Sequence, residues 1–176
     1  MKVLLPEYSH LNRSSLIIRQ QTRIMKVTDL INKDKCKRNF SFEVLPPLQG
    51  SGTGNLFSTI DKLKEFDPLF INITTHHSEY VYKELDNGQF ERQRIRRRPG
   101  TVAIAAAIQN RYGIPVIPHV ICSGATIEDI EYELLDLQFL GISNLLLLRG
   151  DKAKDDKVFT PIKNGYTHTT ELIQQL

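Results

Sequence analysis

The chain has 176 residues, of which 40% are hydrophobic and 24% charged, and its formal net charge at pH 7 is +3. This length can bury a core and favours one domain, and the composition is that of a soluble globular protein. No apolar run approaches the roughly 18 residues of a membrane span, and the charge is too small to indicate a nucleic-acid partner. We therefore expect the protein to bind neither a membrane nor a nucleic acid.

Residues 1–24 differ in composition from the rest of the chain. Four basic side chains accompany a single acid, Glu7, and no clear periodicity is present. An organelle transit peptide has a similar composition, but an upstream extension before an internal start at Met25 is the favoured interpretation. We expect residues 1–24 to lie outside the fold and residues 25–176 to form the folded domain.

The two cysteines, Cys36 and Cys122, are not accompanied by a secretory signal peptide. Disulfides persist mainly in oxidising compartments, so these residues are most simply reduced thiols. The sequence thus predicts a cytoplasmic protein in which neither cysteine is catalytic.

From Phe40 onward, short apolar runs alternate with amphipathic segments, which is the pattern of βα units and a parallel sheet. Four strands are predicted, at residues 40–45, 69–74, 114–121 and 143–148. Pro115 and Pro118 argue against a regular third strand, because proline donates no ladder hydrogen bond. The apolar run 145–148 suits a strand that is buried on both faces.

The segments between these strands carry helix signals. Asn55 and Thr101 are predicted to cap the first two helices, and Gly113 follows the end of the second. Thr126 and Asp129 stand at capping positions of the third helix, and residues 168–176 resemble the start of a fourth. The polar connection before Thr101 contains an arginine run, which is interpreted as a solvated loop rather than a phosphate site: Arg92, Arg94, Arg96, Arg97 and Arg98.

Four sequential βα units predict either a small open sheet or one half of an eight-unit β/α barrel. In both, ligands bind beyond the carboxyl ends of the strands, so the polar residues there are the candidate site residues. Each predicted strand contributes to this set: Glu43, Thr74, Thr75, His119, Arg149, Gly150 and Asp151.

The residue types leave several roles open. Glu43 has apolar neighbours, so it is either a desolvated general acid with a raised pKa or a glutamate paired with a cation. His119 could contact a cofactor, bind a metal or form a hydrogen bond in the core. Arg149 and Asp151 could present a cation and an anion to a bound ring system, or form a local salt bridge. No metal is expected, because the adjacent His76 and His77 lack any recognised ligand spacing.

Five motifs in register resemble those of the methylenetetrahydrofolate reductase family. They are Phe40-Ser41-Phe42-Glu43-Val44-Leu45-Pro46-Pro47, Asn72-Ile73-Thr74-Thr75, Arg98-Pro99-Gly100-Thr101, Ile117-Pro118-His119-Val120 and Leu147-Leu148-Arg149-Gly150-Asp151. The resemblance covers roughly residues 25–176. It implies the N-terminal half of a (β/α)8 barrel of TIM type, with about four βα units present.

The resemblance also implies a cytoplasmic flavoprotein that binds FAD at the carboxyl ends of the strands. Such an oxidoreductase uses NADH or NADPH to reduce its folate substrate, 5,10-methylenetetrahydrofolate, to 5-methyltetrahydrofolate, which serves one-carbon metabolism and methionine biosynthesis. The nicotinamide and the folate use the same flavin face in turn. Family members commonly associate, so a homo-oligomer is a possible state, but neither the oligomer nor the preferred nicotinamide follows from the sequence.

The family's functional positions map onto this chain by motif. Glu43 aligns with the general acid that helps to open the folate ring, and Asp151 with the aspartate near the flavin pyrimidine ring. Other matched positions line the flavin or nicotinamide: Thr74, Thr75, His77, His119, Arg149 and Gly150. At the start of the fourth helix the family often has Tyr-Ala where this chain has His168 and Thr169, so the contact made there is an open question.

Three alternatives remain. The chain could be a truncated, non-catalytic fragment of the enzyme, whose first and fourth strands are open edges. It could be an open-sheet ligand-binding domain, although Pro46-Pro47 is a poor start for a phosphate loop. A metal-dependent barrel hydrolase that uses His76, His119 and Asp151 lacks the ligand spacing.

Overall fold

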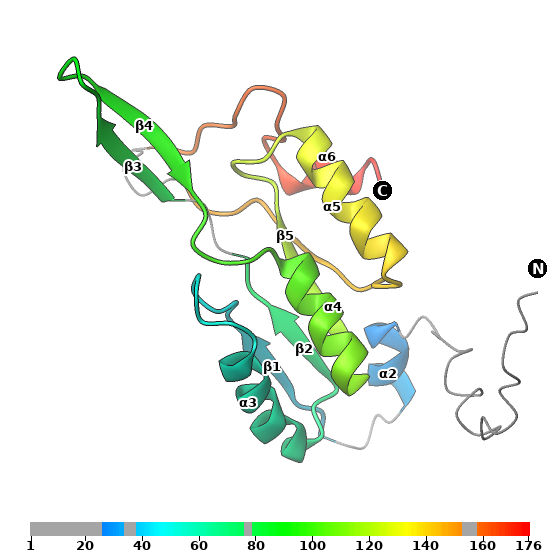
Figure 1. Cartoon of the computed structure of the whole chain (residues 1–176). Helices are drawn as coiled ribbons and strands as arrows, with labels where there is room; N and C mark the ends of the chain where they lie inside the picture. Colours follow the sequence, from blue (N-terminus) through cyan, green and yellow to red (C-terminus); the bar gives the residue numbers. More distant parts are fainter. Residues whose placement is uncertain (1–25, 34–37, 76–78, 153–157) are drawn as a thin grey trace, which may run out of the picture.

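A computed structural model describes residues 26–33, 38–75, 79–152 and 158–176. The predicted extension 1–24, Cys36, His76 and His77 lie outside the described residues. Figure 1 shows a parallel sheet with helices packed against it and a separate hairpin that projects from this body.

Four parallel strands form the central sheet, in the order β1-β2-β5-β6. They are β1 (Ser41–Val44), β2 (Phe70–Ile73), β5 (Val116–Ile121) and β6 (Leu146–Leu148). Glu43 lies opposite Asn72, Ile73 opposite Pro118, and His119 opposite Leu146. Each of these strands falls within a predicted strand, so the α/β class with a parallel sheet is confirmed; the larger barrel stays a prediction.

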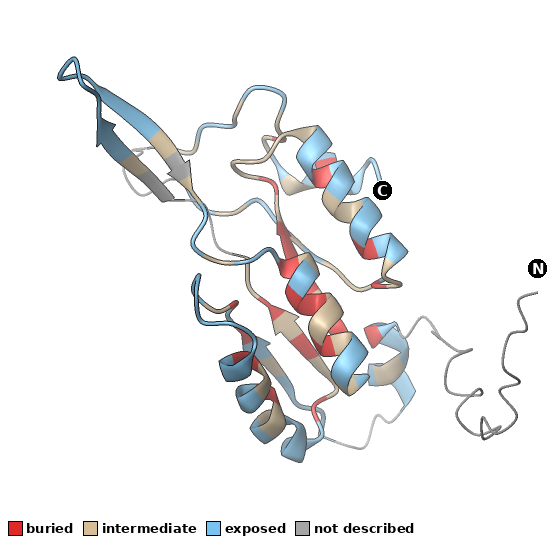
Figure 2. Ribbon diagram, viewed as in Figure 1, coloured by how far each residue is buried: buried red, intermediate tan, exposed pale blue. Residues whose placement is uncertain are grey.

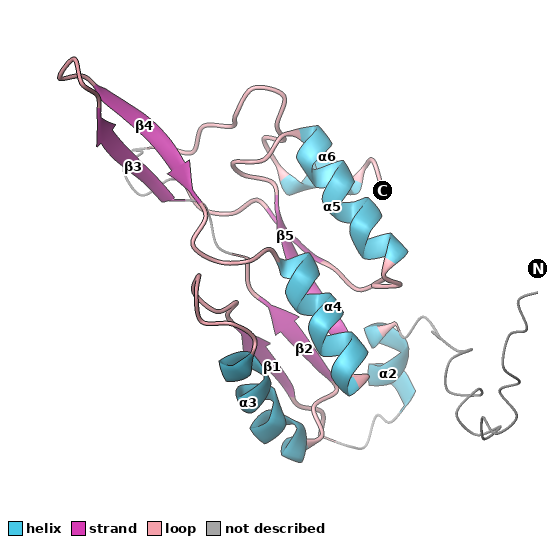
Figure 3. Ribbon diagram, viewed as in Figure 1, coloured by secondary structure: helices cyan, strands magenta, loops and turns pink. Residues whose placement is uncertain are grey.

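Three helices follow the first three strands of this sheet: α3 (Gly54–Leu63), α4 (Thr101–Tyr112) and α5 (Ile127–Phe139). The short 3-10 turn η1 (Lys64–Phe66) extends α3, and α6 (Thr169–Ile173) contacts β6 (Figure 3). The helix α2 (Val27–Lys33) precedes the sheet and is tied to it where the Val27 amide donates to Asn144 Oδ1 at 2.9 Å. The strands of the central sheet are thus separated by helices, as the sequence pattern predicts.

The core lies between the sheet and these helices, as Figure 2 shows by the buried residues on α4, β2 and β5. Branched aliphatic side chains dominate it, which suits strands that are packed against helices. Its fully buried members include Ile60, Ile71, Ile73, Ile108, Val116, Val120, Ile130 and Leu137.

The third strand forms as predicted despite its prolines, whereas one expectation about the fourth strand is wrong. The prolines do not interrupt β5: the Pro115 carbonyl accepts from the Ile71 amide at 2.9 Å, and Pro118 is buried in register with Ile73. Proline lacks a donor, but its carbonyl still accepts. Burial of β6 on both faces is not found, since Leu146 and Leu148 are exposed. Leu146 and Leu148 point to the face of the sheet opposite to the one that carries the buried core residues Ile71, Ile73 and Val120.

The connection after β2 forms a hairpin that the sequence pattern did not predict. Strands β3 (Glu79–Glu84) and β4 (Phe90–Ile95) pair antiparallel and stand clear of the body (Figure 1). The expected solvated loop is therefore wrong for Arg92 and Arg94, which lie on β4. Asn87-Gly88 was the available signal, because Asn-Gly favours tight hairpin turns, and Gly88 has a φ of 75°.

Of the three predicted N-terminal caps, only the one at α5 is confirmed, together with the glycine that ends α4. Asn55 lies inside α3, and Thr101 is the first residue of α4, whose N-cap is Gly100. Thr101 is buried, so its hydroxyl serves tertiary contacts and not the helix end. At α5, Thr126 and Asp129 form the predicted capping box, and Gly113 ends α4 in a left-handed conformation as expected.

The capping box should contribute measurably to stability. We expect Thr126→Ala to lower the free energy of unfolding by about 0.5–2 kcal/mol, because the Asp129 amide loses its acceptor. Thr59→Ala is the matched control: Thr59 is an exposed threonine within α3 that bonds only the Asn55 carbonyl, and its loss should be close to neutral. Urea denaturation of both variants tests this, and equal losses would contradict it.

Candidate functional site

The carboxyl ends of the parallel strands meet at one edge of the sheet, and hydrogen bonds extend the pairing past the strands. The Thr74 amide donates to the Val44 carbonyl at 3.0 Å, and the Ser123 amide donates to the Arg149 carbonyl at 2.8 Å. The residues that follow β1, β2, β5 and β6 are therefore held together, as the sequence predicted.

Glu43 and Thr74 form a direct contact at this edge. The Thr74 hydroxyl donates to Glu43 Oε1 at 2.8 Å, which orients the carboxyl group. The side chain of Glu43 is nevertheless exposed. Of the two roles left open for Glu43, the desolvated carboxyl group is not found, because the neighbouring Phe42 and Val44 point to the other face of the strand, toward the helices.

His119 is the buried polar residue of the edge. Only 5% of its surface is exposed, and no hydrogen-bond partner for its Nε2 atom exists among the described residues. Burial lowers the pKa of His119 below its ordinary value of 6.5, and the nearby Glu43 carboxylate opposes this shift. Burial thus favours the neutral form of the His119 ring, which lies near the carboxyl group of Glu43.

The backbone carbonyl of His119 accepts hydrogen bonds from two threonine side chains. Its carbonyl accepts from the Thr75 hydroxyl and, at 3.4 Å, from Thr101 Oγ1. Thr75 and Thr101 thereby join the ends of β2 and β5 to the start of α4. Because the Thr75 hydroxyl donates its proton to this carbonyl, Thr75 positions the backbone of His119.

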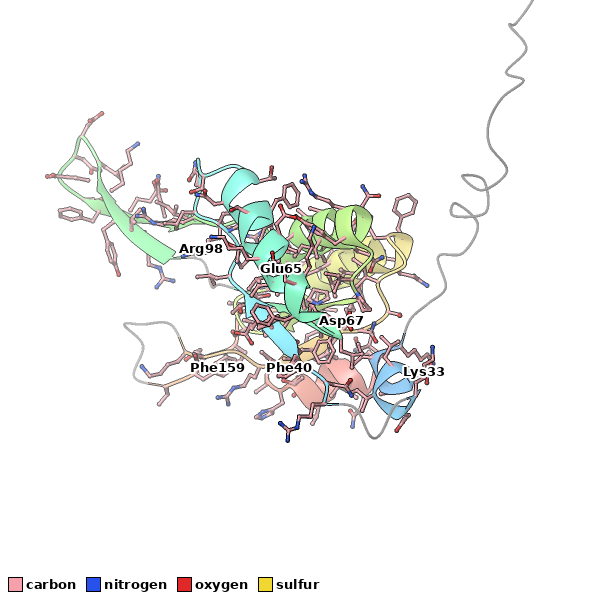
Figure 4. All side chains as sticks on the ribbon, turned by 90° about the horizontal axis from the view of Figure 1, so that it is seen from below. Lys33, Phe40, Glu65, Asp67, Arg98 and Phe159 are labelled. Carbon is pink, nitrogen blue, oxygen red and sulfur yellow. The ribbon has the colours of Figure 1, made fainter. Side chains whose placement is uncertain are left out.

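The Arg149-Gly150-Asp151 turn leaves both charged side chains exposed. The guanidinium carbon of Arg149 lies 4.7 Å from the ring centroid of Phe159, which is a cation–π distance. Figure 4 shows Phe159 on the side of the sheet away from α3. Within the described residues no ion pair joins Arg149 to Asp151, so the local salt bridge is not the arrangement adopted. Gly150 has a φ of 83°, a left-handed conformation that favours glycine.

Two further predicted residues come from the start of α6. His168 is exposed and is the N-cap of α6 without a side-chain cap bond. Thr169 makes a side-chain hydrogen bond with Cys122, whose pKa is raised by burial. Cys122 is a free thiol, as the sequence predicted. His77 is outside the described residues.

A cavity of about 440 Å³ is lined in part by residues that the sequence did not predict as site residues. It is lined by Thr75 and Ser123 at the strand ends, by the segment 96–102, and by the acids Asp129, Glu133 and Asp136 of α5. Arg98, labelled in Figure 4, donates to the Pro46 carbonyl and so ties this segment to β1.

Glu133 is the half-buried acid of this cavity, whereas Asp129 and Asp136 are exposed. Its Oε1 atom accepts from Thr101 Oγ1 at 3.0 Å. Burial raises the pKa of Glu133, whereas Thr101 and Arg96 act in the opposite direction. Its spacing was a usable signal, because Glu133 lies three residues after Ile130 and four before Leu137 on the buried stripe.

Two further properties concern the described residues alone. None of their helices is long and apolar enough to cross a membrane. They also contain no group of three or more His, Cys, Asp or Glu side chains that could hold a metal ion. The fold and edge residues define a parallel α/β protein with a polar site at the carboxyl ends of its strands.

A sequence model of the methylenetetrahydrofolate reductase family matches residues 26–176, and the chain belongs to this family. It is 29% identical over 154 residues to "Methylenetetrahydrofolate reductase (NADH) 1" of Arabidopsis thaliana, covering 86% of this chain and 23% of the relative. It is 26% identical over 156 residues to methylenetetrahydrofolate reductase 2 of Saccharomyces cerevisiae, covering 86% and 24%. It is 28% identical over 113 residues to the 5,10-methylenetetrahydrofolate reductase of Escherichia coli, covering 64% and 33%. The chain thus spans about a quarter to a third of the length of these relatives.

Because His119 is buried and its pKa is lowered, we expect the protein to lose folding stability at acid pH. A lowered folded pKa means that the unfolded chain takes up the proton first, so stability is present above pH 6.5 and is lost as the pH falls through and below that value. We expect His119→Gln to remove this part of the pH dependence, as measured by urea denaturation on both sides of pH 6.5. The exposed His168→Gln is the control and should leave the slope unchanged.

Glu133 should change the pH dependence of folding stability in the opposite direction from His119. Its raised folded pKa means that its favourable contribution is complete below about pH 4.5 and is lost as the pH rises through the folded value. Relative to the wild type, Glu133→Gln should therefore gain stability on going from acid to neutral pH. The exposed Glu131→Gln should show no such gain, and equal pH profiles of the two variants would contradict the assignment.

Proposed function

We propose that this chain supplies part of the flavin site of a cytoplasmic enzyme that reduces 5,10-methylenetetrahydrofolate to 5-methyltetrahydrofolate with NADH or NADPH. The observation that carries the proposal is the meeting of Glu43, Thr74 and His119 at one sheet edge, in a chain of this family. The name of the Arabidopsis relative, which specifies NADH, favours NADH as the electron donor.

Glu43 is proposed as the proton donor to the folate ring. Its exposure allows a substrate to reach it, and the Thr74 hydroxyl fixes the position of Oε1. The second carboxyl oxygen is then the atom that carries the proton. An acid held in one orientation satisfies the first requirement of general acid catalysis, which is geometry.

The residues at this edge fit a flavin. Nε2 of His119 is a buried polar atom without a partner among the described residues, so it can bond a polar ligand atom. Leu146 lies opposite His119 and Leu148 opposite Ile121, and both leucines are exposed, which offers an apolar surface to a planar ring. When bound, FAD supplies the acceptance and transfer of hydride.

The charged turn after β6 would meet the polar parts of these ligands. Asp151 is proposed to lie near the flavin pyrimidine ring, where a negative charge favours a cation that develops on the folate. Arg149, Gly150, Thr75, His168 and Thr169 are proposed as contacts or supports of the flavin or nicotinamide, and so is His77. The left-handed Gly150 lets the backbone approach a ligand closely.

Glu43→Gln tests the proposed acid. We expect this variant to bind FAD as the wild type does and to retain bleaching of the flavin by NADH, while folate reduction falls by about 10²- to 10⁴-fold. Flavin absorbance and folate turnover are measured in the chain and in a fusion that continues it with the remaining part of the Escherichia coli relative. The exposed Glu65→Gln serves as the matched control. Failure of both proteins to bind FAD, or full folate reduction by Glu43→Gln, would contradict the proposal.

A further inference from the structure

Two hydrogen-bond contacts in series join the helical layer to the sheet edge that carries the candidate site. Thr101 Oγ1 lies 3.0 Å from Glu133 Oε1 and 3.4 Å from the backbone oxygen of His119. These three residues belong to α4, α5 and β5. Thr101 is only 2% exposed, so water does not compete with either partner for its hydroxyl group.

When Glu133 is ionised, it takes the hydroxyl proton of Thr101. The hydroxyl group has one proton to donate, and an ionised carboxylate can only accept. A charged acceptor binds a donor more strongly than a neutral carbonyl does. The proton is therefore directed to Glu133 and away from the His119 carbonyl. The two distances agree with this state, because the contact with Glu133 is the shorter one.

When Glu133 is protonated, the direction of the first hydrogen bond reverses. The carboxyl group then donates to Thr101 Oγ1, and the Thr101 hydroxyl donates to the His119 carbonyl. Both contacts become hydrogen bonds at the same time. The protonation of an acid on α5 thus controls a hydrogen bond to the backbone of β5.

The surroundings of Glu133 bring its proton exchange closer to neutral pH. Burial raises the pKa of Glu133 above its ordinary value of 4.5, the Thr101 hydrogen bond and Arg96 oppose this shift, and Asp136 adds to it. The charged and titratable groups that line the cavity with Glu133 come from the segment before α4 and from α5 itself: Arg96, Arg97, Arg98, Asp129, Tyr132 and Asp136.

The position of the His119 ring depends on its backbone. The His119 carbonyl also accepts from the Thr75 hydroxyl, so a second hydrogen bond from Thr101 would hold the end of β5 on two sides. Nε2 of His119 is buried and has no hydrogen-bond partner among the described residues. Fixing the backbone that carries this ring reduces the entropy that a ligand loses when it bonds Nε2.

We propose that Glu133 is a positioning residue for His119, which acts through the Thr101 hydroxyl and strengthens ligand binding at the sheet edge when its carboxyl group is protonated. The choice of FAD as the ligand rests on the proposed function. The exchange of hydrogen bonds does not, because it takes place in the chain without a ligand.

The first test follows the His119 backbone by NMR in the full chain without FAD. Protonation of Glu133 should shift the carbonyl carbon resonance of His119, because the carbonyl then accepts from Thr101. In Glu133→Gln the side-chain amide donates to Thr101 at every pH, so this part of the shift should already be present at neutral pH and should not titrate. His119 also titrates in acid, and the comparison of the two proteins separates its effect from that of Glu133.

The second test is the dissociation constant of FAD for the full chain, measured by flavin fluorescence over a range of pH. At neutral pH we expect Glu133→Gln to bind FAD about two- to tenfold more tightly than the wild type, which is the worth of one net hydrogen bond. The difference should disappear in acid, where the wild type is protonated as well. Glu131→Gln changes an exposed acid of the same helix, and as the matched control it should bind FAD as the wild type does.

Substitutions of Thr101 test how the effect reaches His119. Thr101→Val has no hydroxyl group, so in that background Glu133→Gln should leave FAD binding unchanged. Thr101→Ser keeps the hydroxyl group and should keep the effect of Glu133→Gln. Urea denaturation verifies that each variant is folded.

Equal carbonyl shifts of His119 in the wild type and in Glu133→Gln at neutral pH would overturn the proposal. So would an effect of Glu133→Gln on FAD binding that persists in Thr101→Val. If none of these proteins binds FAD, the proposed flavin site fails instead, and the carbonyl titration still decides the role of Glu133.

Discussion

The parallel pairing of β1, β2, β5 and β6 is the constraint on which the candidate site depends. Parallel strands have their carboxyl ends at the same edge, so side chains far apart in sequence meet there. Backbone hydrogen bonds beyond the strands strengthen this arrangement, with the Thr74 amide on the Val44 carbonyl and the Cys122 amide on the Leu148 carbonyl. The contact between Glu43 and Thr74 follows from the pairing, because it extends a register already set by the backbone.

The two faces of the sheet have different environments, and this difference sets the chemistry of the edge. Helices α3, α4 and α5 follow the first three strands and cover the face that carries Ile71 and Ile73. His119 and Glu43 point to the other face, where one is buried and the other exposed. A neutral imidazole and an accessible carboxyl group therefore lie near one another in distinct surroundings. Such a pair can hold a ligand and donate a proton to it without either group serving both purposes.

Thr101 connects the edge to the helical layer. Its single hydroxyl lies within hydrogen-bond distance of the His119 carbonyl and of Glu133, so it links β5, α4 and α5. A hydroxyl has one proton to donate, so an ionised Glu133 competes with the carbonyl for it, whereas a protonated Glu133 can donate to the hydroxyl instead. The outer side of α5 is chemically separate, since Phe139 contributes nothing to the core.

The sequence by itself determined the features that rest on local pattern. Apolar runs marked the four parallel strands, Thr126 with Asp129 marked a capping box, and the motif residues marked the family and the edge on which Glu43 lies. Only the tertiary structure decided which side chains are buried and which hydrogen-bond partners they have. Glu43 and Leu146 are exposed, and the Thr101 hydroxyl bonds residues of α5 and β5 rather than capping its own helix. The physical reason is that periodicity depends on neighbouring residues, whereas solvent exposure and hydrogen-bond partners depend on chain segments distant in sequence.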